Sequence, residues 1–245
     1  MAERRIQKGL AEKLAQMVGS GAEVPVDLQK LAESLGVTEV LLTELVEDGR
    51  TTWIDGRPKI ELRADRPATR TRFTLAHEIA HILVAQDQTV ARRTQGLDHD
   101  VLETLCDWVA AALLMPREWM QRFADRDNYN LSLLRLVANS ADVSLSAAAV
   151  RLAEVGGRTC MLLRFQRAPK RWVVVGHAGV PKEFIGNLEV PAETCLLLDG
   201  LVTWRDTWHD LTLKSRKRYL VARAHLDRSG QTCIALVTSL ERIDG

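Results

Sequence analysis

One short stretch of the chain, from Thr71 to Val84, limits its fold more than any other. It contains His77-Glu78-Ile79-Ala80-His81, and four residues are just over one helical turn, so a helix stacks both histidines on one face. Pro67 suits the first turn of such a helix. The apolar stripe that this helix would bury is formed by Leu75, Ile79, Ile82 and Leu83. The stretch therefore predicts an amphipathic helix that presents two imidazole rings together.

These residue types in this order suit a metal centre. His77 and His81 can direct ring nitrogens at one ion, and Glu78 lies beside them, placed to take a proton from water. The alternative interpretation is that the two histidines simply belong to an amphipathic helix. A third ligand elsewhere in the chain would favour the metal centre.

A second helix, predicted from Asp100 to the proline that stops it at Pro116, offers that ligand. Glu103 and Asp107 are four residues apart and share one face of it. Glu103 would complete a set of two histidines and one glutamate, which leaves the fourth position of a zinc ion for water. Asp107 suits the role of accepting the other N–H of a ligating histidine. Alternatively, both carboxylates form a solvated face.

Cys106 lies between these two acids, three residues after Glu103. A thiolate is a preferred soft ligand of zinc, so Cys106 is a candidate inhibitory fourth ligand that would occupy the place of the catalytic water. The other interpretation is that the small side chain only packs.

Two motifs together resemble the ImmA/IrrE family of zinc metallopeptidases. They are Arg72-Phe-Thr-Leu-Ala-His-Glu-Ile-Ala-His81 and Glu103-Thr-Leu-Cys-Asp-Trp-Val-Ala-Ala-Ala-Leu-Leu-Met-Pro116. The resemblance covers roughly residues 20 to 155, and many members have Asn at the position of Asp107. It implies Zn²⁺ on His77, His81 and Glu103, with Glu78 as the base. It also implies cleavage of a helix-turn-helix repressor, often in stress or mobile-element regulation, with an anti-phage and DNA-damage branch.

The predicted fold class is α+β in two domains. Residues 1–156 form a zincin-like helical metallopeptidase domain with a small sheet and a helical extension. Its expected elements include helices over residues 3–18 and after Pro25, and strands over Val40–Val46 and Lys59–Arg63. The second of these strands is either an edge strand that pairs with substrate or merely scaffold.

Residues 157–245 follow Gly156-Gly157, where the pattern becomes strand-like, and predict a smaller strand-rich, sensor-like domain. The family resemblance suggests that it is GAF-like. Its expected strands are Thr159–Arg164, Trp172–Gly176, Cys195–Leu198, Tyr219–Ala224 and Thr232–Thr238.

Two regions near the centre of the chain carry open alternatives. Gln86 to His99 is predicted as a polar loop at the rim of the cleft, where His99 is either an extra ligand or transition-state donor, or merely solvated. His99 and Tyr129 are the candidate oxyanion donors. The helices predicted over residues 131–138 and 145–155 suit either a helix-turn-helix or a packing element. Packing is favoured because Arg151 is the only basic group of the second helix.

The net charge of +1 over 245 residues hides an asymmetry. From Arg158 onward there are 14 Lys and Arg against 9 Asp and Glu, so the basic side chains lie in the C-terminal part. Aromatic rings beside a basic cluster are typical of binding to single-stranded nucleic acid, through stacking and phosphate contacts. The residues concerned are Trp204, Trp208, Lys214, Arg216, Lys217, Arg218 and Tyr219. Single-stranded DNA is therefore a candidate activator, and a solvated loop beside partly buried tryptophans is the alternative.

The first residues contain no apolar signal core, and no uncharged run, Trp108 to Pro116 included, is long enough to cross a bilayer. Four widely spaced cysteines favour a reducing cytoplasm and no membrane partner. The predicted function is thus a zinc-dependent endopeptidase that cleaves a helix-turn-helix repressor. The alternatives are a non-catalytic anti-repressor and a DNA-binding regulator.

Overall fold

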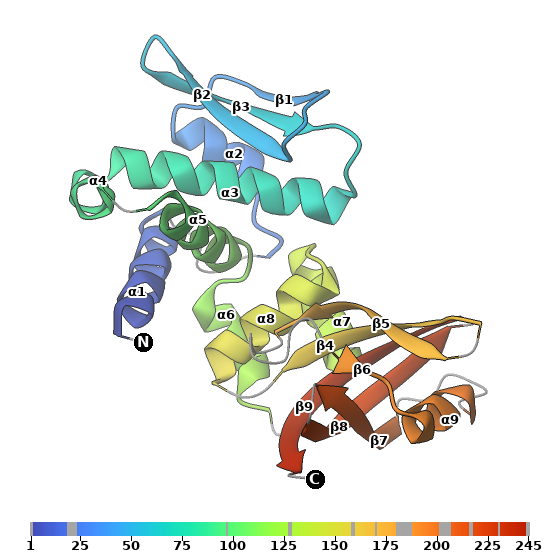
Figure 1. The fold of residues 1–245 in the computed structure, drawn as a ribbon. Coiled ribbons are helices and arrows are strands. Elements are labelled where there is room, and N and C mark those ends of the chain that lie inside the picture. The colour runs from blue at the N-terminus through green and yellow to red at the C-terminus, as the bar shows by residue number, and fades with distance from the viewer. Residues whose placement is uncertain are drawn as a thin grey trace. The chain divides into compact units, whose positions relative to one another are not determined.

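The structure, a computed structural model, describes residues 2–18, 24–96, 98–126, 129–157, 160–169, 171–179, 188–200, 207–215, 218–229 and 231–243. The chain divides into two compact units (Figure 1). The first consists of Met1–Met120 with Asn139–Ser144, and the second of Gln121–Ala138 with Leu145–Gly245. The second unit thus contains residues 131–138 and 145–156, most of two central helices, together with the C-terminal sheet. A domain boundary at residue 156 stays a prediction.

The first unit is built around two helices that pack against each other. Its helices are α1 (Ala2–Met17), α2 (Leu28–Ser34), α3 (Ala68–Gln86), α4 (Gln88–Thr94), α5 (His99–Leu114) and the start of α6 (Arg117–Ala124). The helix predicted from the histidine motif is α3, which begins directly after Pro67. In Figure 1, α3 has the small sheet on one side and α5 on the other.

The segment from Gln86 to His99 is not a loop, so that prediction was wrong. α4 occupies its middle, and the carboxylate of Asp87 caps this helix by accepting hydrogen bonds of 2.9 Å from the backbone N–H groups of Thr89 and Val90. Val90 is buried, whereas its neighbours are polar and mostly exposed. One buried residue in a polar run leaves too weak a periodic pattern to show the helix.

The small sheet has the order β1-β3-β2. β1 (Val40–Thr43) runs parallel to β3 (Arg57–Arg63), and β2 (Gly49–Ile54) pairs antiparallel with it. β3 is therefore the central strand, and the prediction that Lys59–Arg63 is an edge strand was wrong. The edge near the motif helix is β2, which joins β3 through Asp55-Gly56, both with positive φ, in a two-residue hairpin turn.

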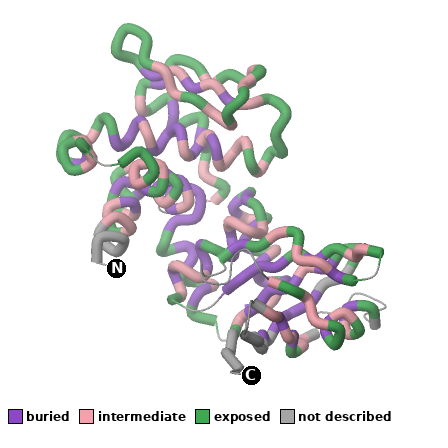
Figure 2. Tube along the Cα trace, in the orientation of Figure 1, coloured by how far each residue is buried: buried purple, intermediate pink, exposed green. Residues whose placement is uncertain are grey.

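The core of the first unit follows the motif helix. Figure 2 shows buried residues along both α3 and α5. On α3, the apolar residues Ile79, Ile82 and Leu83 are buried as their spacing predicts. The small sheet and α5 thus cover two sides of α3. His77 and His81 lie on the helix surface that stays partly exposed to solvent.

The second unit holds a six-stranded antiparallel sheet with the order β5-β4-β9-β8-β7-β6. These strands are β4 (Met161–Arg167), β5 (Trp172–Ala178), β6 (Leu188–Glu189), β7 (Thr207–Ser215), β8 (Arg218–Ser229) and β9 (Thr232–Ile243). A mixed helix-and-sheet fold with a strand-rich C-terminal region is thus confirmed. The GAF-like character of that region stays a prediction.

Cys195–Leu198 is not a strand, so this prediction was wrong. The segment lies in helix α9 (Ala192–Gly200), which packs on β7. The Thr194 hydroxyl donates to the Thr212 carbonyl at 2.7 Å, and the indole N–H of Trp172 donates to Asp199 at 2.8 Å. These two bonds fix both ends of α9 on the sheet.

The central helices are α7 (Leu131–Ala141) and α8 (Leu145–Gly156), and they bend by 104° at their junction. α8 packs on β4 and β5. Arg151 is 4% exposed, and its guanidinium lies 3.6 Å from Glu154, so the one basic side chain of this helix is buried in an ion pair. This supports packing over DNA readout. Among the described residues no single helix is long and apolar enough to cross a bilayer, although the bent pair reaches that composition.

Candidate metal centre

Three side chains from two helices converge at the centre of the first unit. Nε2 of His77 lies 3.1 Å from Nε2 of His81 and 3.2 Å from Oε2 of Glu103, and Nε2 of His81 lies 3.3 Å from Oε1 of Glu103. Ligands about 2.0–2.1 Å from one tetrahedral zinc ion are separated by about 3.3 Å. The three donors therefore fit such an ion. No other group in the described part of the chain forms a metal-binding cluster of this kind.

Each histidine has a second partner at its other ring nitrogen. Nδ1 of His77 lies 2.9 Å from Oδ1 of Asp107, and Nδ1 of His81 lies 3.5 Å from Sγ of Cys106. When Nε2 binds an ion, Nδ1 carries the proton and donates it, so each partner fixes the tautomer and the orientation of its ring. One turn of α5 thus supplies a ligand and a partner for both histidines.

The structure places the sulfur of Cys106 away from the position expected of a fourth ligand. It lies beside Nδ1 of His81, whereas the converging ligand atom of that ring is Nε2. The side chain is fully buried, and this burial raises the pKa of the thiol well above its ordinary value. The geometry supports a role beside His81 or in packing, rather than on the ion.

Glu78 lies next to the cluster but is not a member of it. The residue is 6% exposed, and Oε2 of its carboxylate accepts a 2.8 Å hydrogen bond from the hydroxyl of Thr51 on β2. Burial raises the pKa of Glu78, and the bond from Thr51 together with the charge of His77 opposes the rise without cancelling it. A base with a raised pKa is better matched to proton transfer near neutral pH.

The two histidines differ in their electrostatic surroundings. Burial alone would lower the pKa of His77, but the hydrogen bond and charge of Asp107, with the charges of Glu78 and Glu103, outweigh it and raise the pKa. The pKa of His81 is lowered, first by burial and then by the charge of His77. Of the two rings, His77, beside Asp107, is therefore the one that is more easily protonated.

Neither candidate oxyanion donor is fixed at the cluster. His99 is 81% exposed at the start of α5, with Nδ1 4.0 Å from Oε1 of Glu103. The hydroxyl of Tyr129 is buried and donates to the Ala124 carbonyl at 2.7 Å, so its proton is already used. His99 thus remains the candidate of the two.

The proposed nucleic-acid cluster lies only partly within the described structure. Trp204, Arg216 and Lys217 are outside the described residues, and Arg218 and Tyr219 are described only as the first residues of β8. On β7, the ring of Trp208 lies 5.2 Å from that of buried His225, and Lys214 lies 3.8 Å from Glu189. Trp208 therefore takes part in packing.

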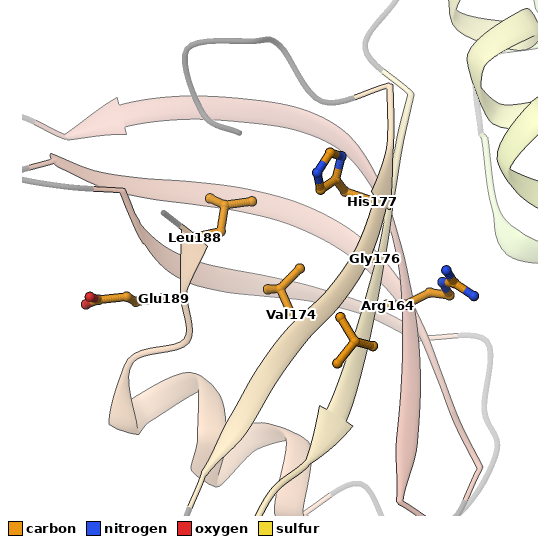
Figure 3. A pocket seen from close by; sticks show the side chains of 7 residues that line it. Arg164, Val174, Gly176, His177, Leu188 and Glu189 are labelled. Carbon is orange, nitrogen blue, oxygen red and sulfur yellow. The ribbon is translucent and has the colours of Figure 1, made fainter. Parts of the chain in front are cut away.

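A separate cavity of about 690 Å³ lies in the second unit (Figure 3). Val174, His177, Leu188 and Glu189, from β5 and β6, line it. Arg164 of β4, labelled in Figure 3, is also among the lining residues. None of the metal-centre residues contributes to this cavity.

Thr51 and Gly49 are the residues at the site that sequence patterns did not indicate. A carbon atom in the place of a Gly49 side chain would lie 2.9 Å from Oε1 of Glu78. One sequence signal could have indicated this strand. Asp55-Gly56 is typical of a two-residue hairpin turn, and such a turn connects two strands, so a strand is expected just before it.

Comparison with known proteins identifies the family of this chain. Residues 26–153 match the peptidase M78 family model, described as the IrrE N-terminal-like domain. The radiation response metalloprotease IrrE of Deinococcus deserti is 41% identical over 90 residues, which are 35% of this chain and 32% of that protein. For its namesake in Deinococcus radiodurans the identity is 38% over 96 residues, 37% of this chain and 29% of that protein. The matches thus span about a third of each relative's length.

A solved structure described as a Mycobacterium tuberculosis transcriptional regulator has a similar fold. Its TM-score is 0.55, and the similarity covers 96% of this chain and 76% of that one. At 12% sequence identity, this likeness concerns the fold alone.

Proposed function

The chain belongs to the ImmA/IrrE family of metallopeptidases, and from this premise we propose that it is a zinc-dependent endopeptidase. One observation carries the proposal. Three donor atoms converge at the distances that a tetrahedral ion requires, and a buried carboxylate, Glu78, lies beside them without joining them. A purely structural zinc site is closed by four ligands and has no use for such a base.

In the proposed mechanism His77, His81 and Glu103 would hold a zinc ion. A bound ion would supply Lewis acidity toward a carbonyl oxygen and toward water. Glu78 accepts the proton of the attacking water on a carboxylate oxygen and passes it to the leaving amine. The Nδ1–H group of His77 donates a hydrogen bond to the Asp107 carboxylate, and this bond keeps Nε2 directed toward the other ligand atoms.

The proposed substrate is a helix-turn-helix repressor whose cleavage relieves repression of a stress or defence operon. Support comes from the family and from the names of the two Deinococcus relatives, which are radiation response metalloproteases. An extended substrate segment would pair with β2, because β2 is the edge strand whose Thr51 reaches the base. Four free cysteines suit a reducing cytoplasm as the place of this reaction.

Single-stranded DNA is the proposed activator. The excess of basic side chains after Arg158 and the sequence of the 204–219 region support this part of the proposal. Activation by DNA is a separate claim from peptide hydrolysis.

The test compares wild-type protein with Glu78→Gln. The probes are small helix-turn-helix proteins, taken first from any that a neighbouring reading frame encodes, each mixed with the zinc-loaded variants. We expect Glu78→Gln to keep one zinc and the wild-type fold, and to cleave about 10²–10⁴ times more slowly, because the base is lost. His77→Ala and Glu103→Ala should instead lose the metal.

Two outcomes would contradict the proposal. Equal cleavage by wild type and Glu78→Gln would remove the hydrolase function. Tight binding of the repressor without any cleavage would favour the non-catalytic anti-repressor.

A further inference from the structure

The edge strand β2 approaches the motif helix more closely than a side chain at Gly49 would allow. A carbon atom added there would lie 2.5 Å from Cγ2 of Thr74 and 2.9 Å from Oε1 of Glu78. Both contacts are shorter than real side chains tolerate, and Thr74 and Glu78 are one helical turn apart on α3. The backbone of β2 therefore lies against the helix at the level of the base.

Strand alternation turns the next side chain of that face toward the base. Gly49 pairs with Leu62 and Thr51 pairs with Ile60, two buried residues of β3, so Gly49 and Thr51 face α3. The Thr51 hydroxyl donates to Oε2 of Glu78 at 2.8 Å.

We propose that Thr51 is a positioning residue that holds the Glu78 carboxylate beside the metal site and off the ion. This rests on the proposed function. A glutamate side chain has several rotamers, and fixing one costs up to about 2 kcal/mol of conformational entropy, which the hydrogen bond offsets. Carboxylate oxygen is itself a zinc ligand, so a glutamate without this restraint can rotate into the place of the attacking water.

Because Thr51 lies on β2, one strand both pairs with the substrate and positions the base in this proposal. Among the described strands, β2 is an edge strand of its sheet, and it is the proposed pairing partner of the substrate. Thr51 of the same strand hydrogen-bonds the Glu78 carboxylate of α3. β2 would therefore set the distance between the scissile peptide and that carboxylate. A base misplaced by about 1 Å can lower a rate by about 10²-fold.

The test uses zinc-loaded full-length protein and the best-cleaved member of a pooled library of quenched fluorescent peptides. Thr51→Val keeps the branched shape but removes the hydroxyl, and Thr51→Ser keeps the hydroxyl. Thr43→Val, on β1 at the opposite edge of the sheet, is the matched control. We expect Thr51→Val to lower kcat about tenfold with KM within about twofold and one zinc retained. Thr51→Ser and Thr43→Val should stay within about twofold of wild type.

A second measurement does not depend on activity. In a crystal structure of zinc-free Thr51→Val, we expect the Glu78 carboxylate to leave the position that it has in the wild type. An unmoved carboxylate, or equal kcat values for Thr51→Val and wild type, would overturn the inference. A wild-type protein without hydrolysis would overturn the proposed function instead, and the crystal structure of the variant would then decide the role of Thr51.

Discussion

Each histidine of the metal centre uses its two ring nitrogens for different purposes. The Nε2 atoms of His77 and His81 converge with Glu103, while their Nδ1 atoms face Asp107 and Cys106. Asp107 is a strong acceptor because it is charged, whereas a neutral thiol is a weak one. The two ligands are therefore held with unequal strength, and His77 is the more firmly oriented.

The position of Cys106 leads to a spectroscopic prediction. Cobalt(II) substituted for zinc should show no thiolate-to-metal charge-transfer absorption, because the sulfur faces Nδ1 of His81 and not the converging atoms. Cys106→Ala should bind zinc up to about tenfold more weakly, through the loss of the partner of His81. The measurements are the absorption spectrum and competition with a chelator.

A charge-transfer band in the wild type that is absent from Cys106→Ala would show that the sulfur is on the ion. Cys160→Ala is the control, because Cys160 is also buried and free but belongs to the second unit.

The residues of the site divide by how far apart their partners are in the sequence. His77, Glu78 and His81 lie on one helix, so their spacing alone predicts that they lie together. Thr51 contacts Glu78 across 27 residues of sequence, and no local pattern encodes that contact. The same holds for Gly49, whose role depends on how near a strand and a helix approach each other.

Elements with a strong periodic pattern were predicted well, and those that depend on a few contacts were not. α3 and α5 carry long apolar stripes and lie where the sequence predicts them. β2 has one glycine, two threonines and an arginine in six residues, so it lacks an apolar alternation. The short apolar run at Cys195–Leu198 fits a buried helix as well as a buried strand, so its pattern alone does not distinguish the two structures.

A carboxylate in the loop before β2 ties the small sheet to the start of α3. Asp48 accepts hydrogen bonds from Arg66 at 2.7 Å and from Nε of Arg70 at 2.8 Å. The bonds from Arg70 and Arg66 hold the pKa of Asp48 below its ordinary value. Asp48→Asn should therefore destabilise the first unit at neutral pH by about 1 kcal/mol, a small value because both arginines are more than a third exposed.

The pH dependence follows from the lowered pKa. A group with a depressed pKa in the folded state contributes its stability above its ordinary value, 3.8 here, and loses it as the pH falls through the depressed pKa. The melting temperature of Asp48→Asn should be about 2–4 °C lower than that of the wild type at pH 6, and the difference should vanish in strong acid. Asp55→Asn, in the exposed hairpin turn, is the control. A difference that persists unchanged in acid would contradict the role assigned to the Asp48 charge.

At the scale of the whole molecule, the two units carry different chemistry. All the converging ligands belong to the first unit, and the excess of basic side chains lies in the second. The mixed fold class and the strand-rich C-terminal region could be predicted from the change of period after Gly156. The grouping of α7 and α8 with the second sheet could not, because helices show which face is buried but not what covers it.

The proposed activator gives a prediction for the full chain. A labelled single-stranded oligonucleotide of mixed sequence should bind weakly, with an affinity that falls as salt rises. Replacing Arg216, Lys217 and Arg218 by Glu should abolish binding, while one zinc is retained. Fluorescence anisotropy over a salt series is the measurement. Replacing Arg92 and Arg93 on α4 by Glu is the control for charge reversal, since these arginines belong to the first unit. If the oligonucleotide does not bind the wild-type protein and does not change its peptide hydrolysis, the activator is not single-stranded DNA.

The order of the site residues along the chain has a consequence for biosynthesis. The ligands, their hydrogen-bond partners and the base lie between Gly49 and Asp107, and β9, the last strand of the second sheet, ends 136 residues later at Ile243. At about 5–20 residues per second, a ribosome needs roughly 7–27 s to add those residues. The ligands and the base thus leave the ribosome well ahead of the second unit. Any restraint that the second unit places on the peptidase begins only after that interval, so a newly made chain passes through a period in which its catalytic groups are present without it.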